Sequence, residues 1–251
     1  MSDFHDVSIN LLSALIGLTA GWARGAAANR LRYRHARGLW RQLAGPTVNI
    51  VVGAHSVTGW ETAGLMGIGD AFAVSELQQH LVSIGAGQPK IIYGGRLEAE
   101  TRRNDLILIG GPDTNSMTRE VMKRLAGTFK FLDPPAHTFA IRDAHGGKTY
   151  DPDPPTNGEG TDFGVLVRAV NPFNPEASVL IVAGAYGLGT WAGARLVHSK
   201  AFMQEPLVRA MIPFECLFET DVVASTPQAT KILALRSLDV DPAAIGGSAV
   251  I

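Results

Sequence analysis

The stretch that most constrains the fold covers residues 104–115, where a buried strand is followed by a tight loop and a helix. Residues 106–109 are four consecutive apolar residues with a Gly-Gly-Pro turn after them. Such a run is typical of a strand that is covered on both faces. Thr114 or Asn115 can cap the helix that follows, and we expect its first backbone N–H groups to face the carboxyl end of the strand.

A second strand–loop–helix unit covers residues 179–194. Gly187, Gly189 and Ala192 satisfy the pattern G-x-G-x-x-G/A after a strand and at the start of a helix. No acidic residue that would bind a ribose is evident about 20 residues further on, so a standard NAD site is not predicted. Two such loops from one sheet would face a common crevice. The alternative is that the glycines only permit close packing of helix on sheet.

The rest of the globular region, residues 46–251, alternates between strand and helix patterns. We expect further strands at residues 48–52, 90–93, 128–132, 163–170, 214–223 and 231–235, and helices at residues 70–84 and 116–126. The turn-rich stretch 133–162 predicts a β-hairpin insertion, and residues 56–69 predict a long loop that is either a lid or a surface excursion. The pattern favours an α/β, Rossmann-like fold with a largely parallel sheet and helices on both faces.

Residues 1–45 differ from the remainder. Between Val7 and Ala23 there is no charged residue, which is near the short limit of a membrane-spanning helix. The arginines that follow are Arg24, Arg30, Arg32, Arg34, Arg37 and Arg41. The positive-inside rule then predicts a single-pass membrane-anchor helix at residues 7–23 with the globular domain in the cytoplasm. The alternative is a soluble helix packed on the domain.

Two kinds of partner follow from this anchor. The arginine cluster predicts contact with anionic lipid head groups. Small residues recur every four positions at Ser13, Gly17, Gly21 and Gly25. Such a ridge lets two membrane helices approach closely and suggests a homodimer.

Composition and missing motifs exclude several classes of protein. The net charge is −1 and no extended basic stretch with interleaved aromatic residues follows residue 44, so no nucleic acid is expected as a partner. The single cysteine, Cys216, cannot form an intramolecular disulfide. No phosphate loop, H-E-x-x-H motif or G-x-S-x-G elbow is present. The acids between Asp151 and Asp162 lack a recognised calcium-loop spacing, so no metal site is predicted, and no cofactor is identified.

The remaining candidates are acids and loop residues near the expected strand ends. Glu76 and Asp70 are the catalytic candidates. If Glu76 faces the crevice, its carboxylate under apolar walls has a raised pKa and can act as a base or nucleophile, but its neighbours Ala73 and Leu77 leave its direction open. For Asp70 and Asp113 the alternative role is helix capping. The expected ligand-binding residues are Gly110, Gly111, Asp113, Asn115, Gly184, Gly187, Gly189 and Thr190.

The arrangement from Val48 to Phe131, with Gly-Asp-Ala-Phe-Ala-Val-Ser-Glu-Leu at residues 69–77, resembles the nucleoside deoxyribosyltransferase-like and Toll/interleukin-receptor-like Rossmannoid domains. The resemblance covers about a third of the chain. It implies that a glutamate acts on the glycosidic bond of a nucleoside or nicotinamide nucleotide, and Glu76 is the nearest acid.

Two hypotheses for function follow. The first is a membrane-anchored cytoplasmic domain that binds a nucleotide or related phosphate-bearing small molecule, with or without cleavage of its glycosidic bond. The second is a non-catalytic, membrane-associated sensor or scaffold. Whether the chain is an enzyme stays open at this point.

Overall fold

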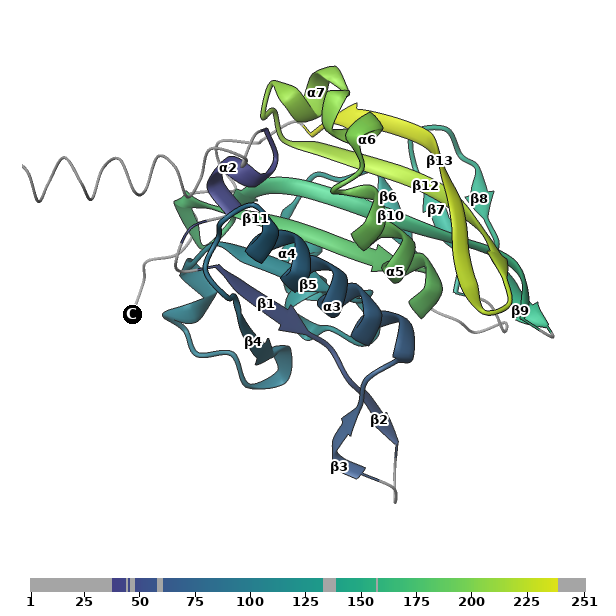
Figure 1. Cartoon of the computed structure of the whole chain (residues 1–251), viewed down its shortest axis with the longest axis horizontal. Coiled ribbons are helices and arrows are strands. Elements are labelled where there is room, and N and C mark those ends of the chain that lie inside the picture. The colour runs from purple at the N-terminus through teal and green to yellow at the C-terminus, as the bar shows by residue number, and fades with distance from the viewer. Residues whose placement is uncertain are drawn as a thin grey trace, which may run out of the picture.

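The computed structural model of the chain (Figure 1) describes residues 38–43, 45, 48–57, 61–132, 139–156 and 158–238. The helices in this part are α2 (Trp40–Leu43), α3 (Ile68–Ser83), α4 (Ser116–Arg124), α5 (Gly187–Leu196), α6 (Lys200–Gln204) and α7 (Pro206–Arg209), with short 3-10 helices at Gly94–Arg96 and Thr101–Arg103. The strands are β1 (Asn49–Val52), β2 (His55–Val57), β3 (Glu61–Leu65), β4 (Lys90–Tyr93), β5 (Leu106–Ile109), β6 (Phe129–Phe131), β7 (Ile141–Asp143), β8 (Thr149–Tyr150), β9 (Asp153–Thr156), β10 (Glu159–Asn171), β11 (Asn174–Gly184), β12 (Phe214–Val223) and β13 (Thr226–Ser237).

A central sheet organises the molecule, with the strand order β13-β12-β10-β11-β5-β1-β4 and β9 paired to β10. Strands β4, β1, β5 and β11 pair in parallel, which confirms the α/β class and the parallel core of the sheet. Strands β10, β12 and β13 join it antiparallel. The sheet is therefore more mixed than expected, because β10–β11 and β12–β13 are connected by turns too short for a parallel crossover.

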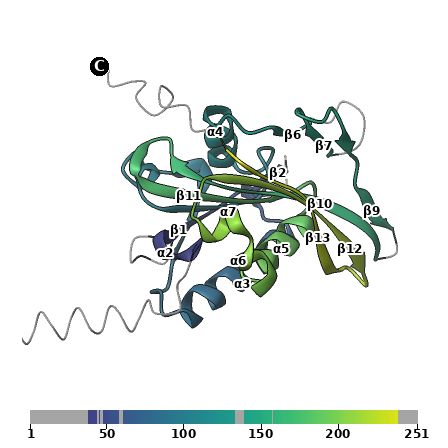
Figure 2. The same cartoon turned by 90° about the horizontal axis from the view of Figure 1, so that it is seen from above.

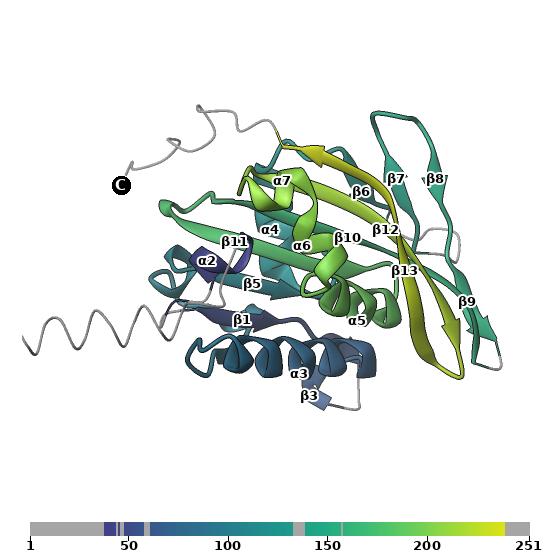
Figure 3. The same ribbon diagram turned by 45° about the horizontal axis from the view of Figure 1, so that its top comes forward.

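Helices cover both faces of the sheet. Figure 2 shows α4 on one side and α3, α5 and α6 on the other, and Figure 3 shows α3 and α5 side by side. All four residues of β5 are fully buried. Since successive side chains in a strand point to opposite faces, Ile107 and Ile109 join the apolar cluster under α3 and α5, whereas Leu106 and Leu108 join the one under α4. The expected strand covered on both faces is thus confirmed.

Two expected segments differ in the structure. The loop expected at residues 56–69 contains the β2–β3 hairpin, in which His55 pairs with Leu65, and α3 already begins at Ile68. Strand β6 does not enter the central sheet and instead pairs with β7 in a sheet of three short strands. β6 cannot pair with β5, which precedes it in the chain, because both edges of β5 are already occupied, by β1 and by β11.

The hairpin expected within residues 133–162 is formed by β7 and β8, which pair antiparallel. The expected anchor at residues 7–23 and the arginines up to Arg37 lie outside the described residues. In the part of the chain that the structure describes, no helix is long and apolar enough to cross a membrane.

Candidate functional site

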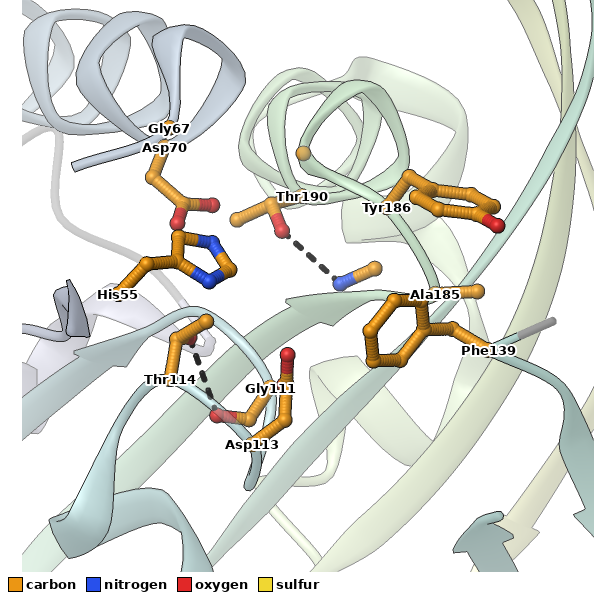
Figure 4. Close-up of a pocket in the computed structure, with 12 residues that line it drawn as sticks. His55, Gly67, Asp70, Gly111, Asp113, Thr114, Phe139, Ala185, Tyr186 and Thr190 are labelled. Atoms are coloured by element: carbon orange, nitrogen blue, oxygen red, sulfur yellow. Dashed lines mark hydrogen bonds between the residues drawn. The ribbon is translucent and has the colours of Figure 1, made fainter. Parts of the chain in front are cut away.

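The chain leaves the neighbouring parallel strands β1 and β5 toward opposite faces of the sheet. After β1 the chain turns to α3 on one face of the sheet, and after β5 it turns to α4 on the other. Such a switch point leaves a crevice where α/β proteins bind ligands. A small pocket of about 80 Å³ lies there (Figure 4). It is lined by His55, Gly67, Asp70, Gly111, Asp113, Thr114, Phe139, Gly184, Ala185, Tyr186, Gly187 and Thr190.

One buried side chain holds the two strand ends together. Asn115 caps α4 as predicted, because its Oδ1 accepts from the backbone N–H groups of Met117 (3.0 Å) and Thr118 (3.3 Å). Its Nδ2 donates to the carbonyls of Val51 (3.0 Å) and Ile109 (2.9 Å). Two N–H groups that were expected to face a ligand are therefore already satisfied by this cap.

Backbone N–H groups of the glycine-rich loop before α5 likewise donate to a side chain of the protein, a carboxylate on β10. Asp162 accepts from the backbone N–H groups of Tyr186 (3.1 Å) and Gly189 (2.6 Å), and the Thr190 hydroxyl accepts from the N–H of Gly184 (3.0 Å). Burial raises the pKa of Asp162 to about 7, against these hydrogen bonds. From the sequence, Asp162 is indistinguishable from the other acids of its loop.

Asp70 is the titratable group at the centre of the pocket. It lies in the first turn of α3, is 6% exposed, and its Oδ1 has no hydrogen-bond partner among the described residues. Burial raises its pKa to about 6, which a hydrogen bond from Thr190 and the charge of His55 oppose and the charge of Asp113 reinforces. Figure 4 shows its carboxyl group directed toward His55. A carboxyl group with this pKa can hold or release a proton near neutrality.

The other catalytic candidate, Glu76, does not line the pocket. Its side chain is 36% exposed and lies 3.9 Å from Nε2 of His198 and 3.5 Å from Nε1 of Trp191. Six residues along α3 from Asp70 correspond to about 9 Å of rise and a different face of the helix. The sequence left the direction of Glu76 open, and the structure places its side chain away from the pocket.

The expected ligand-binding residues divide into two groups. Gly111, Asp113, Gly184, Gly187 and Thr190 line the pocket together with Asp70. Gly110, Asn115 and Gly189 are not among its lining residues. Gly110 has a φ of +95°, and this left-handed conformation lets the chain turn sharply after β5.

Sequence reasoning missed six lining residues: His55, Gly67, Thr114, Phe139, Ala185 and Tyr186. The position of His55, shortly after a parallel strand, was a usable signal. Phe139 had none, because it reaches the pocket from beyond β6, where it packs edge-on against Tyr186 with ring centroids 5.4 Å apart. In Figure 4 these two rings form the wall opposite Asp70 and His55.

The fold and the pocket together define an α/β protein with a ligand-type crevice at the carboxyl ends of parallel strands. Comparison with protein-family models gives no match, and comparison with curated proteins gives none either. Among the described residues, no group of three or more His, Cys, Asp or Glu side chains could hold a metal ion.

Two glycines of the second loop should respond differently to alanine. A Cβ at Gly189 would lie 2.5 Å from the carbonyl oxygen of Phe163, whereas a Cβ at Gly187 would meet nothing closer than 3.5 Å. We expect Gly189→Ala to lower the free energy of unfolding by about 1–3 kcal/mol and Gly187→Ala to change it by less than about 1 kcal/mol. Urea denaturation of both variants measures this, and equal losses would contradict the geometry.

Proposed function

We propose that the pocket binds the sugar of a nucleoside, nucleotide or related glycoside and that Asp70 acts on that sugar as a general acid or base. The observation that carries this proposal is the buried Asp70 carboxyl group, with an unpartnered oxygen and a pKa near 6, at the carboxyl ends of parallel strands. A buried polar atom without a partner is costly and is often explained by function. A sugar hydroxyl can donate the missing hydrogen bond.

The charges around the pocket favour a sugar over a bare phosphate. Asp70 and Asp113 both line it, and two carboxyl groups repel an anion but accept hydrogen bonds from hydroxyl groups. The N–H groups of Met117, Tyr186 and Gly189 already donate to Asn115 or Asp162. A phosphate carried by the ligand would therefore lie outside the pocket.

The pocket is large enough to enclose only part of such a ligand. Its volume of about 80 Å³ is well below the roughly 300–1,000 Å³ of pockets that enclose whole drug-sized ligands. The sugar would occupy the pocket, and the base or phosphate would extend past the rings of Phe139 and Tyr186. Aromatic rings pack well against the apolar face of a sugar or a base.

Cleavage of the glycosidic bond is the reaction that this arrangement suits. Protonated Asp70 would give its proton to the leaving base as the bond between base and sugar breaks, and the electron pair would leave with the base. A water molecule then adds to the sugar carbon, and its proton returns to Asp70. Asp113, on the other loop, would stabilise positive charge that develops on the sugar.

A thermal-shift titration tests binding. The full-length chain in mild detergent should melt at a temperature that rises with the concentration of adenosine, AMP or NAD. Asp70→Asn should lose this rise, whereas Asp221→Asn, which removes an exposed carboxylate on β12, should keep it. Release of free base, followed by chromatography, tests cleavage. No shift with any of these compounds at millimolar concentration would favour the scaffold hypothesis instead.

The membrane anchor is a separate proposal that rests on the sequence of residues 7–23 and the arginines after it. We expect the amino terminus outside and the α/β domain in the cytoplasm. A reporter that is active only in the cytoplasm should be active when fused after Ile251. Activity of an exported reporter at the same position, with the cytoplasmic one silent, would refute this topology.

A further inference from the structure

A second, larger cavity lies away from the crevice, beside α2, the carboxyl-terminal end of α3 and the short helices α6 and α7. Its volume is about 760 Å³, which is in the range of pockets for small organic molecules. Trp40, His80 and His198 are among its lining residues. The proposed reaction at Asp70 uses none of these residues.

The polar groups around this cavity can all donate hydrogen bonds. Lys200 and Arg209 are exposed at its rim, and none of the lining residues is acidic. Glu76 lies 3.9 Å from His198 Nε2 but is not among the lining residues. The cavity therefore differs in charge from the pocket at Asp70 and Asp113.

Three buried nitrogens at this cavity have no hydrogen-bond partner in the described part of the chain. They are Nε1 of Trp40, Nε2 of His80 and Nδ1 of His198. The rings of His80 and His198 stack with centroids 4.9 Å apart, and Trp40 packs against His80 at 4.8 Å. Unsatisfied nitrogens are costly, and such a cluster at one cavity indicates a missing partner. The three nitrogens are themselves buried, so a bound ligand would have to shift the rings to reach them.

Burial keeps the two histidines neutral. It lowers the pKa of His80 to about 4, with the charge of His198 acting in the same direction, and it also lowers the pKa of His198. A neutral imidazole still carries one N–H donor. The full positive charges of the cavity are then those of Lys200 and Arg209, and the histidines and Trp40 contribute neutral donors.

Apolar side chains complete the lining. Ile84 and Met203 also line the cavity. An inorganic ion would leave these surfaces uncovered, whereas a molecule with both an anionic group and an apolar body would cover them.

We propose that this cavity is a binding site for an amphipathic organic phosphate, whose anionic group is bound by Lys200 and Arg209, with hydrogen bonds from Trp40, His80 and His198, and whose apolar body packs on Ile84 and Met203. This chemistry is shared by soluble aryl phosphates and by the phosphate head group of an anionic lipid. The site is independent of the sugar site, so the two proposals can fail separately.

Isothermal titration calorimetry of the full-length chain with phenyl phosphate tests the soluble source. The double variant Lys200→Gln/Arg209→Gln removes both rim charges at exposed positions and should bind roughly tenfold more weakly. Lys231→Gln, at an exposed position of β13, removes a charge elsewhere and should bind like the wild type. Circular dichroism verifies that all three proteins are folded alike.

Flotation with vesicles of phosphatidylcholine and phosphatidic acid tests the lipid source. The arginine-rich amino-terminal segment is the same in every variant, so the difference between wild type and double variant reports on Lys200 and Arg209, and Lys231→Gln measures the effect of losing an exposed charge elsewhere. Weaker phenyl phosphate binding by the double variant supports a soluble ligand, and weaker flotation supports a lipid head group. Equal behaviour of wild type and double variant in both assays, or binding in neither, overturns the proposal.

Discussion

At pH 8, Asp70→Asn should be more stable than the wild type by up to about 3 kcal/mol while losing ligand binding. Burial raises the pKa of Asp70 from 3.8 to about 6, and each unit of pKa corresponds to about 1.4 kcal/mol. The unfolded chain loses its proton near pH 4 and the folded chain only near pH 6. The stability of the wild type from this group is therefore complete below about pH 4, falls as the pH rises to about 6, and stays low above it.

The amide in the Asp70→Asn variant has a similar shape to the carboxyl group but never becomes charged. The stability of the variant should therefore not fall between pH 4 and pH 6 as that of the wild type does. The amide also cannot transfer the proton that the proposed reaction requires. Urea denaturation of both proteins between pH 4 and pH 8 measures the effect as the difference between their free energies of unfolding. The titrations of Asp162, whose pKa is raised, and of His80, whose pKa is lowered, cancel in this difference because both proteins contain them. A difference that stays constant over this range would show that Asp70 ionises equally well in the folded and unfolded chains.

The largest loss of stability is expected for Asn115→Ala. The Asn115 side chain is fully buried and makes four hydrogen bonds, two as donor to β1 and β5 and two as acceptor from α4. Alanine would leave these four backbone groups without partners in a dry environment. We expect the free energy of unfolding to fall by roughly 3–5 kcal/mol, which corresponds to about 10 °C in melting temperature for a domain of this size.

Two further variants isolate the cause of this loss. Asn174→Ala removes a side chain that also makes two backbone hydrogen bonds, at 2.8 and 3.1 Å, but at an exposed turn, and it should cost less than about 1 kcal/mol. Asn115→Asp retains the cap on α4 but replaces the two donors by a carboxylate oxygen that faces the carbonyls of Val51 and Ile109, so it should not recover the stability of the wild type. If Asn115→Ala melted like Asn174→Ala, the buried hydrogen bonds would not be what holds the strand ends together.

Local patterns in the sequence determined much of the fold around the site. The apolar run of β5, the cap at Asn115 and the strand–loop–helix unit of β11 and α5 are all present where residue patterns predict them. Each depends on interactions between residues that are close in the chain. The ends of the strands and the helix caps are therefore predictable from the sequence. Because both glycine loops follow strands of one sheet, their position at one crevice is predictable as well.

Tertiary structure alone decided which side chains meet in that crevice. Asp70 lies in the pocket and Glu76 outside it because of the rotation of α3 against α5, which no local pattern specifies. Asp162 reaches Tyr186 and Gly189 across 24 and 27 residues, only because the antiparallel register of β10 and β11 places it beside the loop. The register of the sheet thus decides that the N–H groups of the loop before α5 donate to Asp162 and not to a bound phosphate. Register is a property of how distant strands pair, whereas the sequence pattern of each strand determines only that a strand forms.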